Sequence, residues 1–380
     1  MFSKIAQLLS ATLLLTLVGC QAVQNTPTPV VFKFATVGDS RQQPKQAGIS
    51  AQDEKWLQAT PVWSRMLREI EAQKPHALVF NGDMIYGYTT NVAVLDKQYA
   101  FWRGMVAGIM ERGTYVLPVA GNHEVQVPST SADGKYEKKA LVSQEHAWRD
   151  NMGDLILNQS LWKSATGTVA TAWNIDNTPQ IGTDGITTDQ RQLSYSFDSG
   201  AVHIAVINTD PVGFDESAPI TWLAADLAAA KARGAKHFFV FGHKPAFTYF
   251  PIKATKATTD PTAKPFKNRD ESFATRPGLQ EAFWAEMERY NATYFCGHQH
   301  VYHASQPRKA QGGSAWQVLI GSGGTPLGIP ASATDNPHDA MFAWAEVSVL
   351  ADGNVDIAVH GFPDAATKTA RLAQWRLSKP

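Results

Sequence analysis

Five hydrophobic runs in this chain each end in a glycine that is followed by a polar residue able to bind a metal ion. Four of them, at 31–37, 77–81, 238–241 and 292–295, have the composition of buried β-strands, while 115–120 is apolar but interrupted by a proline. The ends of these runs read Gly38-Asp39-Ser40-Arg41, Gly82-Asp83-Met84-Ile85-Tyr86, Gly121-Asn122-His123-Glu124, Gly242-His243 and Gly297-His298-Gln299-His300. Neighbouring strand ends are where α/β folds build their sites. Oxygen and imidazole ligands that converge from five loops suit two divalent or trivalent ions of borderline hardness.

The segments between these runs alternate helical patterns with strand patterns. Thr60-Pro61 is a typical helix start, the apolar residues from Val62 to Ile70 recur at helical spacing, and Pro75 predicts an end near Lys74. Further helices are expected over 94–110, over 219–233 and from 277 onward, a β-hairpin over 193–208, and strands at 315–320, 342–350 and 355–359. This alternation predicts βαβ units and, in total, two β-layers with flanking helices.

The ordered set of strand ends resembles the pattern of the calcineurin-like metallophosphoesterase superfamily, which runs D-x-H, G-D, G-N-H-[DE], G-H and G-H-x-H. The resemblance extends from Phe32 to Val349. It implies an α/β fold with a two-sheet β-sandwich flanked by helices (α/β/β/α), in a single catalytic domain with long loop insertions. It also implies a hydrolase of phosphate esters.

One position departs from this pattern. Arg41 stands where the superfamily normally has a histidine ligand, and a guanidinium cannot ligate a metal. Tyr86, three residues after Asp83, resembles the purple acid phosphatase branch, in which a tyrosinate takes this place and favours Fe(III). The last motif continues to Tyr302 as in that branch, whereas Ala304 stands where the branch often has arginine. The alternative is that Tyr86 only packs in an aromatic loop.

The resemblance implies a ligand set for two metal ions, with Fe(III) and a divalent ion (Zn, Mn or Fe) favoured. Asp83 would bridge both ions. Asp39, His300 and Tyr86 would complete one site, and Asn122, His243 and His298 the other. The nucleophile would be a metal-bound hydroxide.

Three further residues receive roles at the site from the same motifs. His123 follows a ligand and is expected to be the general acid, a role that contributes about 10²–10⁴-fold. Glu124 is expected to orient His123 through its ring N–H. Arg41 either contacts a phosphate oxygen or pairs with a local carboxylate. The expected activity is phosphomonoester hydrolysis. The alternatives are a phosphodiesterase or nucleotidase on the same site and a non-catalytic envelope lipoprotein.

The N-terminus resembles a bacterial lipoprotein signal peptide over residues 1–19, since Leu17-Val18-Gly19 precedes Cys20. We expect a lipid on Cys20, a flexible tether over 20–30 and a location in the bacterial cell envelope, at the outer membrane or facing the periplasm. The alternatives are an ordinary secretory signal and a short anchor helix. The second cysteine, Cys296, is expected to be a small buried residue and not a nucleophile.

The remaining expectations concern domain limits and partners. The phosphoesterase domain is expected over 31–362, followed by a C-terminal tail over 363–380. Polar insertions over 125–192 and 249–273 leave the metal loops and are expected to wall the substrate pocket. Lys plus Arg and Asp plus Glu both number 34, so no large basic surface for nucleic acid is evident. The partners expected are a phosphate-ester small molecule and, through the lipid, a membrane; the sequence reveals no oligomeric state.

Overall fold

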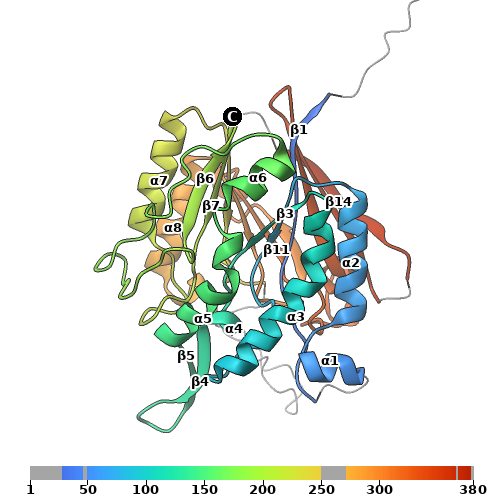
Figure 1. Cartoon of the computed structure of the whole chain (residues 1–380). Coiled ribbons are helices and arrows are strands. Elements are labelled where there is room, and N and C mark those ends of the chain that lie inside the picture. The colour runs from blue at the N-terminus through green and yellow to red at the C-terminus, as the bar shows by residue number, and fades with distance from the viewer. Residues whose placement is uncertain (1–27, 46–48, 250–270, 365–366, 378–380) are drawn as a thin grey trace, which may run out of the picture.

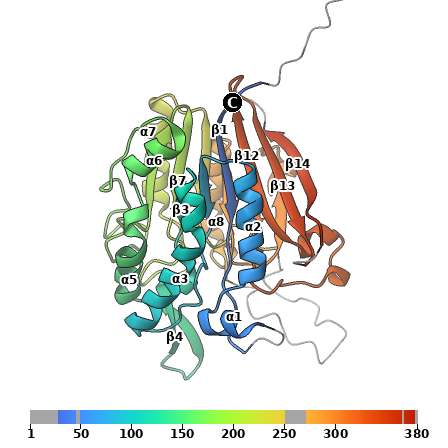
Figure 2. The same cartoon turned by 45° about the vertical axis from the view of Figure 1, so that its right-hand side comes forward.

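Two six-stranded β-sheets pack against each other, and helices cover their outer faces (Figures 1 and 2). The computed structural model describes residues 28–45, 49–249, 271–364 and 367–377. Its strands are β1 (Val30–Val37), β2 (Ala77–Phe80), β3 (Tyr115–Pro118), β4 (Gln126–Thr130), β5 (Tyr136–Ala140), β6 (Tyr195–Ser199), β7 (Val202–Val206), β8 (His237–Phe241), β9 (Thr293–Cys296), β10 (Tyr302–Ser305), β11 (Trp316–Ile320), β12 (Phe342–Leu350), β13 (Val355–Phe362) and β14 (Ala370–Leu377). The α/β fold with two sheets and flanking helices is thereby confirmed.

Both sheets mix parallel and antiparallel strands: the first is parallel toward its β3 edge and antiparallel toward its β14 edge, whereas the second is parallel at its centre and antiparallel at both edges. The first has the order β14-β13-β12-β1-β2-β3, with β1, β2 and β3 parallel. The second has the order β10-β11-β9-β8-β7-β6, with β7, β8, β9 and β11 parallel. In both sheets the loops that follow the parallel strands leave from the same edge, which is where the five motifs lie.

Aromatic rings fill the space between the two sheets. Phe34 of β1 meets Phe239, Phe241 and Phe295 of the second sheet edge to face, with ring centroids 5.1, 5.7 and 5.8 Å apart. Such pairs contribute about 0.5–1.5 kcal/mol each beyond the area that they bury. These aromatic contacts between the sheets therefore lie close to the strand ends that carry the motif loops.

Helices complete the outer layers. They are α1 (Ala51–Trp56), α2 (Thr60–Ala72), α3 (Val92–Glu111), α4 (Asn122–Val125), α5 (Val142–Met152), α6 (Gln159–Thr166), α7 (Ile220–Ala232) and α8 (Pro277–Arg289). Trp63 of α2 and Trp102 of α3 both pack edge to face on Phe80 of β2, at 5.1 Å. On the second sheet, Leu227 of α7 and Phe283 of α8 share a hydrophobic cluster with the strands.

Two expected boundaries differ from the structure. Residues 363–380, predicted as a tail, include β14, which pairs with β13 as the edge strand of the first sheet. From Ala373 to Leu377, half-buried and exposed residues alternate along β14, which is a strand pattern. The helix predicted to end near Lys74 ends at Ala72, because Lys74 takes a left-handed conformation with φ 51°.

The 125–192 insertion is largely folded. It forms the β4–β5 hairpin, α5 and α6, and it places Trp148 and Trp162 in the core. Most of the 249–273 insertion lies outside the described residues, as do the expected signal peptide and Cys20. Lipid attachment and envelope location stay predictions.

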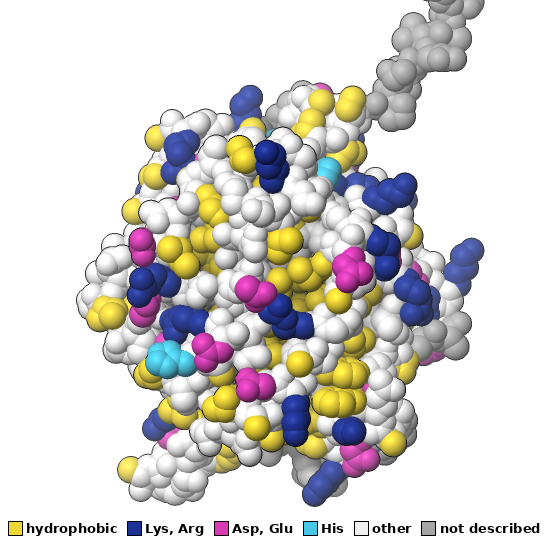
Figure 3. Space-filling view, in the orientation of Figure 1, with side chains coloured by type: hydrophobic (Ala, Val, Ile, Leu, Met, Phe, Trp, Pro, Cys, Tyr) yellow, Lys and Arg dark blue, Asp and Glu magenta, His cyan; other side chains and the backbone are white. Residues whose placement is uncertain are grey.

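On the face shown in Figure 3, Lys and Arg side chains lie among Asp and Glu. Among the described residues, no helix combines the length and apolar character needed to cross a bilayer.

A buried histidine joins the second sheet to α7. His203 on β7 lies 2.7 Å from an oxygen of Asp198 through Nδ1 and 2.9 Å from an oxygen of Asp226 through Nε2. Burial alone would lower the pKa of His203, but the hydrogen bonds to both carboxylates raise it above its ordinary value. Since Asp226 belongs to α7, the protonated ring holds this helix on the sheet.

We expect His203→Gln to lower the free energy of unfolding by about 2 kcal/mol at about pH 6, because it loses hydrogen bonds between charged groups. The raised pKa means that this stabilisation is complete below the unfolded value of about 6.5 and is lost as the pH rises through the folded value. Denaturant unfolding at a series of pH values should show the gap to wild type closing toward alkaline pH. His146→Gln, at an exposed position of α5, is the control, and a gap that widens with pH would contradict the assignment.

Candidate metal centre

The structure brings the predicted ligands together at one edge of the two sheets. Asp39 follows β1, Asp83 follows β2 and Asn122 begins the short helix after β3, while His243 follows β8 and His298 follows β9. Two groups of buried side chains result whose ligand atoms lie within 4.8 Å of one another: Asp83 with His243 and His298, and Asp39 with Asp83 and His300. Asp83 belongs to both groups, as its expected bridging role requires.

The first of these groups, with Asn122 added, is here named the Asn122 position. The Asn122 Oδ1 atom lies 3.0 Å from His243 Nε2 and 2.8 Å from His298 Nδ1. The same His243 nitrogen lies 3.1 Å from Asp83 Oδ1 and 3.3 Å from His298 Nδ1. Ligand atoms about 2.1 Å from one ion are roughly 3.0–3.4 Å apart, so these four atoms fit a single metal ion.

The second group, named the Asp39 position, offers two carboxylates and one imidazole. His300 Nε2 lies 3.5 Å from Asp39 Oδ1, an oxygen that is buried and has no hydrogen-bond partner among the described residues. Burial raises the pKa of Asp39 well above its ordinary value, and the charge of Asp83 adds to this effect. A buried carboxylate oxygen left without a donor fits a site for a cation.

Arg41 reaches into the Asp39 position. Its Nε donates to Asp83 Oδ2 at 3.2 Å, and its Nη2 lies 3.4 Å from His300 Nε2. The pairing with a local carboxylate, one of the two predicted roles, is therefore confirmed. The guanidinium also lines the cavity described below, which keeps the contact with a phosphate oxygen open as a second role.

The histidines differ in charge in the metal-free protein. Burial lowers the pKa of His298 to about 4 and that of His300 to about 3, so both are neutral imidazoles with a lone pair to offer. Burial would also lower the pKa of His243, but Asp83 outweighs it and raises the value to about 9. Metal binding at the Asn122 position must therefore release a proton from His243.

Glu124 does not orient His123, and that prediction was wrong. Its two carboxylate oxygens accept four backbone N–H groups: Oε2 from Asp83 and Gly121 at 2.9 and 2.7 Å, and Oε1 from Met84 and Ile85 at 2.9 and 3.1 Å. The carboxylate thus fixes the turn that carries Asp83, the residue shared by the two metal positions. The sequence signal was real, but it marked a structural support and not a partner of His123.

The ligand loops hold unusual backbone conformations. Asp39, Asp83 and His298 have φ values of 64°, 56° and 71°, in the left-handed region that residues with a Cβ seldom adopt. Gly82, with φ 84°, leaves no room for a Cβ, which would lie 2.7 Å from the backbone of Gly121. Such strain persists only where the surroundings over-determine the conformation, and it gathers at functional sites.

His123 lies beside the metal positions without joining them. Its Nδ1 contacts the backbone carbonyl of Tyr86, and its Nε2 lies 3.7 Å from Asp83 Oδ2. Because a carbonyl only accepts, the proton of the neutral ring belongs on Nδ1. Burial, with the neighbouring Arg41 guanidinium, holds the pKa of His123 well below its ordinary value.

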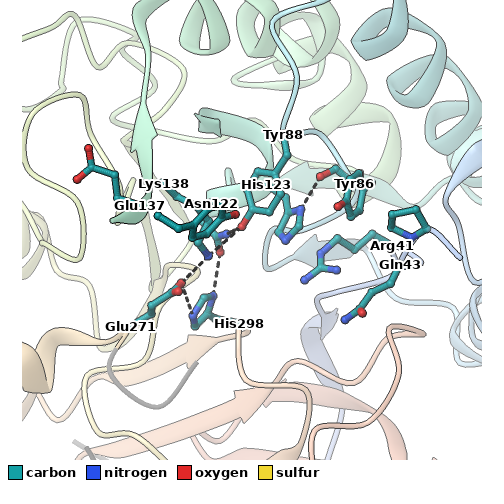
Figure 4. Close-up of a pocket in the computed structure, with 12 residues that line it drawn as sticks. Arg41, Gln43, Tyr86, Tyr88, Asn122, His123, Glu137, Lys138, Glu271 and His298 are labelled. Atoms are coloured by element: carbon teal, nitrogen blue, oxygen red, sulfur yellow. Dashed lines mark hydrogen bonds and ion pairs between the residues drawn. The ribbon is translucent and has the colours of Figure 1, made fainter. Parts of the chain in front are cut away.

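A cavity of about 750 Å³ opens onto this centre. Figure 4 shows Arg41 and Tyr86 on one side of His123, and Lys138 and Glu271 on the other. Lys138 comes from the β4–β5 hairpin, so this part of the 125–192 insertion does wall the pocket.

Three residues of the cavity were missed from the sequence. Tyr88 accepts hydrogen bonds from Asn122 Nδ2 at 2.5 Å and from Lys138 Nζ at 3.0 Å. Lys138 also pairs with Glu271 at 2.9 Å, and Glu271 lies 3.4 Å from His298 Nε2. No motif marked these residues, and only the place of Lys138 and Glu271 in the two insertions pointed toward the pocket.

The hydroxyl of Tyr86 makes no hydrogen bond within the part of the chain that the structure describes, and its half-buried ring packs on Tyr88 and His123, at 5.8 and 5.5 Å. Metal ligation by Tyr86 stays a prediction.

Comparison with known proteins identifies the family to which the chain belongs. The calcineurin-like phosphoesterase family matches residues 58–302, which is more than half of the chain. The chain belongs to the calcineurin-like phosphoesterase family. Membership of this family implies metal-dependent hydrolysis of phosphate esters at a dinuclear metal centre, which the two ligand positions fit. A non-catalytic lipoprotein was the alternative that required a broken ligand set; six of the seven predicted ligands come together here, all except Tyr86.

Solved structures share the fold of this phosphoesterase. The purple acid phosphatase PPD1 from yellow lupin (Lupinus luteus) seeds has a TM-score of 0.55 and 13% identity, over 93% of this chain and 54% of the lupin chain. The phosphoesterase thus spans about half the length of that protein. A dimetal phosphatase from Danio rerio has a TM-score of 0.45 and 12% identity, over 93% of this chain and 100% of its own. At 13% identity the likeness to the lupin protein concerns the fold alone. No protein of curated function matches the sequence.

We expect Glu124→Gln to lower both stability and metal content. The amide would turn an NH₂ group toward backbone N–H donors, which costs about 2–3 kcal/mol for the groups left without an acceptor. Elemental analysis and denaturant unfolding of the purified variant test this. If Glu124 acted through His123, turnover would fall while metal content and stability stayed unchanged. Glu286→Gln, at a buried position of α8 outside the ligand loops, is the matched control.

Proposed function

We propose that this phosphoesterase hydrolyses phosphate monoesters. The observation that supports this is the presence of two cationic side chains, Arg41 and Lys138, on opposite sides of His123 in one cavity (Figure 4). A monoester dianion carries more charge than a diester, so it gains more from two flanking cations.

The side chains divide the work around a bound phosphoryl group. When bound, the two ions supply Lewis acidity and an activated water. Arg41 leaves donors of its guanidinium free for a phosphoryl oxygen, since only Nε and Nη2 are engaged with Asp83 and His300. Lys138, which is paired with Glu271 at 2.9 Å, adds an ammonium group from the hairpin side.

His123 is proposed as the acid that protonates the leaving oxygen. The contact of its Nδ1 with the Tyr86 carbonyl holds the ring so that Nε2, which lies 3.7 Å from Asp83 Oδ2, is the nitrogen not engaged in a hydrogen bond among the described residues. The low pKa makes Nε2–H a strong acid, and the negative charge of a bound phosphate raises the pKa of a neighbouring imidazole. Geometry and charge together are suited to proton delivery once substrate is present.

A three-substrate panel tests both proposals. We expect the metal-loaded protein to have a higher kcat/KM for an aryl monoester than for an aryl diester. His123→Ala should retain both metals and lose about 10²-fold or more in turnover of an alkyl monoester, whose leaving oxygen needs a proton, while the aryl monoester suffers much less.

The panel also separates the alternatives. A preference of wild type for the diester would point to a phosphodiesterase on the same site. An equal loss on both monoesters, with the metals still bound, would make His123 a residue that positions the phosphoryl group. His298→Ala is the contrasting variant, because removing a ligand of the Asn122 position should abolish metal binding and both activities together.

The identity of the metals rests on Tyr86. We propose Fe(III) at the Asp39 position with a divalent ion at the Asn122 position, since Tyr86 lies on the turn that carries Asp83. A tyrosinate ligand to Fe(III) gives a visible charge-transfer absorption band. We expect the oxidised iron-loaded protein to show that band and Tyr86→Phe to lose it. A colourless protein with full iron occupancy, or a band that survives in the variant, would exclude Tyr86 as the ligand.

A further inference from the structure

Tyr88 is held against the catalytic histidine by a constrained backbone. Its ring stacks on His123 with centroids 3.7 Å apart and planes at 27°. Tyr88 itself has φ 52°, a left-handed conformation that is uncommon for an aromatic residue. The preceding Gly87 has φ 56°, and a Cβ there would collide with the carbonyl of His123. The loop is therefore built to place the Tyr88 ring at this spot.

The Tyr88 hydroxyl connects the metal ligands with the substrate hairpin. Figure 4 shows the hydroxyl close to the side chains of Asn122 and Lys138. Both partners approach it with nitrogen atoms: Asn122 Nδ2 at 2.5 Å and Lys138 Nζ at 3.0 Å. This orientation of the Asn122 amide follows from its surroundings, since its Oδ1 faces His243 and His298 in the Asn122 position, where an oxygen is needed.

The hydrogen bonds of the Tyr88 hydroxyl leave its own proton without an acceptor among the described residues. A phenolic oxygen accepts up to two hydrogen bonds and donates one. An amide NH₂ and an ammonium group can only donate, so both acceptor positions of the Tyr88 oxygen are filled. Among the described residues, no acceptor lies within hydrogen-bond distance of this hydroxyl. Its proton is therefore available to a ligand in the cavity that Tyr88 lines.

We propose that the Tyr88 hydroxyl donates a hydrogen bond to a non-bridging oxygen of the substrate phosphoryl group. This rests on the proposed function. The hydroxyl thereby makes two kinds of interaction: its oxygen accepts a hydrogen bond from the Asn122 amide, and its proton is donated to the phosphoryl group. The Lys138 ammonium polarises the phenol and strengthens it as a donor. Burial raises the pKa of Tyr88 well above its ordinary value, which agrees with a hydroxyl that keeps its proton.

Tyr88→Phe tests the proposal because it removes the hydroxyl and keeps the stacked ring. Three quantities are measured on the metal-loaded protein: metal content, kcat/KM for an aryl monoester, and the dissociation constant of inorganic phosphate by calorimetry. We expect full metal content, a loss of kcat/KM on the order of 10²-fold, and phosphate binding weaker by about tenfold, since a donor to a charged oxygen is lost.

The matched control is Tyr99→Phe. Tyr99 is a buried tyrosine of α3 whose hydroxyl has no hydrogen-bond partner among the described residues. This variant removes the same atom outside the cavity, so it should keep wild-type phosphate affinity and activity.

The outcomes separate this inference from the proposed function. Wild-type phosphate affinity and kcat/KM in a metal-loaded Tyr88→Phe protein would overturn it. Loss of metal in that variant would also overturn it, because the hydroxyl would then act only by holding Asn122. If the wild-type protein hydrolysed no phosphate monoester, the proposed function would fail, yet the phosphate dissociation constants of the two proteins would still decide whether Tyr88 contacts the anion.

Discussion

The buried carboxylate of Glu124 is the interaction on which the rest of the site depends. It accepts four backbone N–H groups, three of them from the turn that carries Asp83. Asp83 is shared by both metal positions, and its turn continues directly into the loop with Tyr86 and Tyr88. A left-handed conformation at Asp83 costs free energy, so it needs a fixed support. The Glu124 side chain therefore helps to fix Asp83 and, through the same turn, the loop that carries Tyr86 and Tyr88.

Sequence reasoning recovered those features whose signals are local. A hydrophobic run that ends in Gly-Asp or Gly-His marks a strand end, and the order of five such ends predicted both the fold and the convergence of Asp39, Asp83 and His300. The β-hairpin at 193–208 and the helices flanking the sheets followed from periodicity in the same way. The sequence patterns are strong there because each residue's role depends on its immediate neighbours.

The features that were missed depend on contacts across long stretches of chain. Tyr88 and Lys138 meet although they lie 50 residues apart, and Lys138 and Glu271 are 133 apart. No local pattern records which side chain a hairpin brings to a distant loop. Glu124 illustrates the converse: its position next to His123 suggested a contact between them, but backbone direction turned its carboxylate toward the neighbouring strand end. β14 was missed because its alternation is weak and its polar face is exposed.

The two sheets contribute chemically different ligands to the candidate metal centre. Asp39, Asp83 and Asn122 come from the first sheet and supply oxygen, whereas His243, His298 and His300 come from the second and supply nitrogen. A metal ion bound by both sets would cross-link the two sheets at the edge that carries the ligand loops. Farther from that edge, the sheets are joined by aromatic contacts instead. Removal of the metal ions by a chelator would thus loosen the contact between the two sheets at this edge, while the aromatic core would still hold them together. The sheets could then move relative to each other about that core, and the metal-depleted enzyme would be the more flexible form.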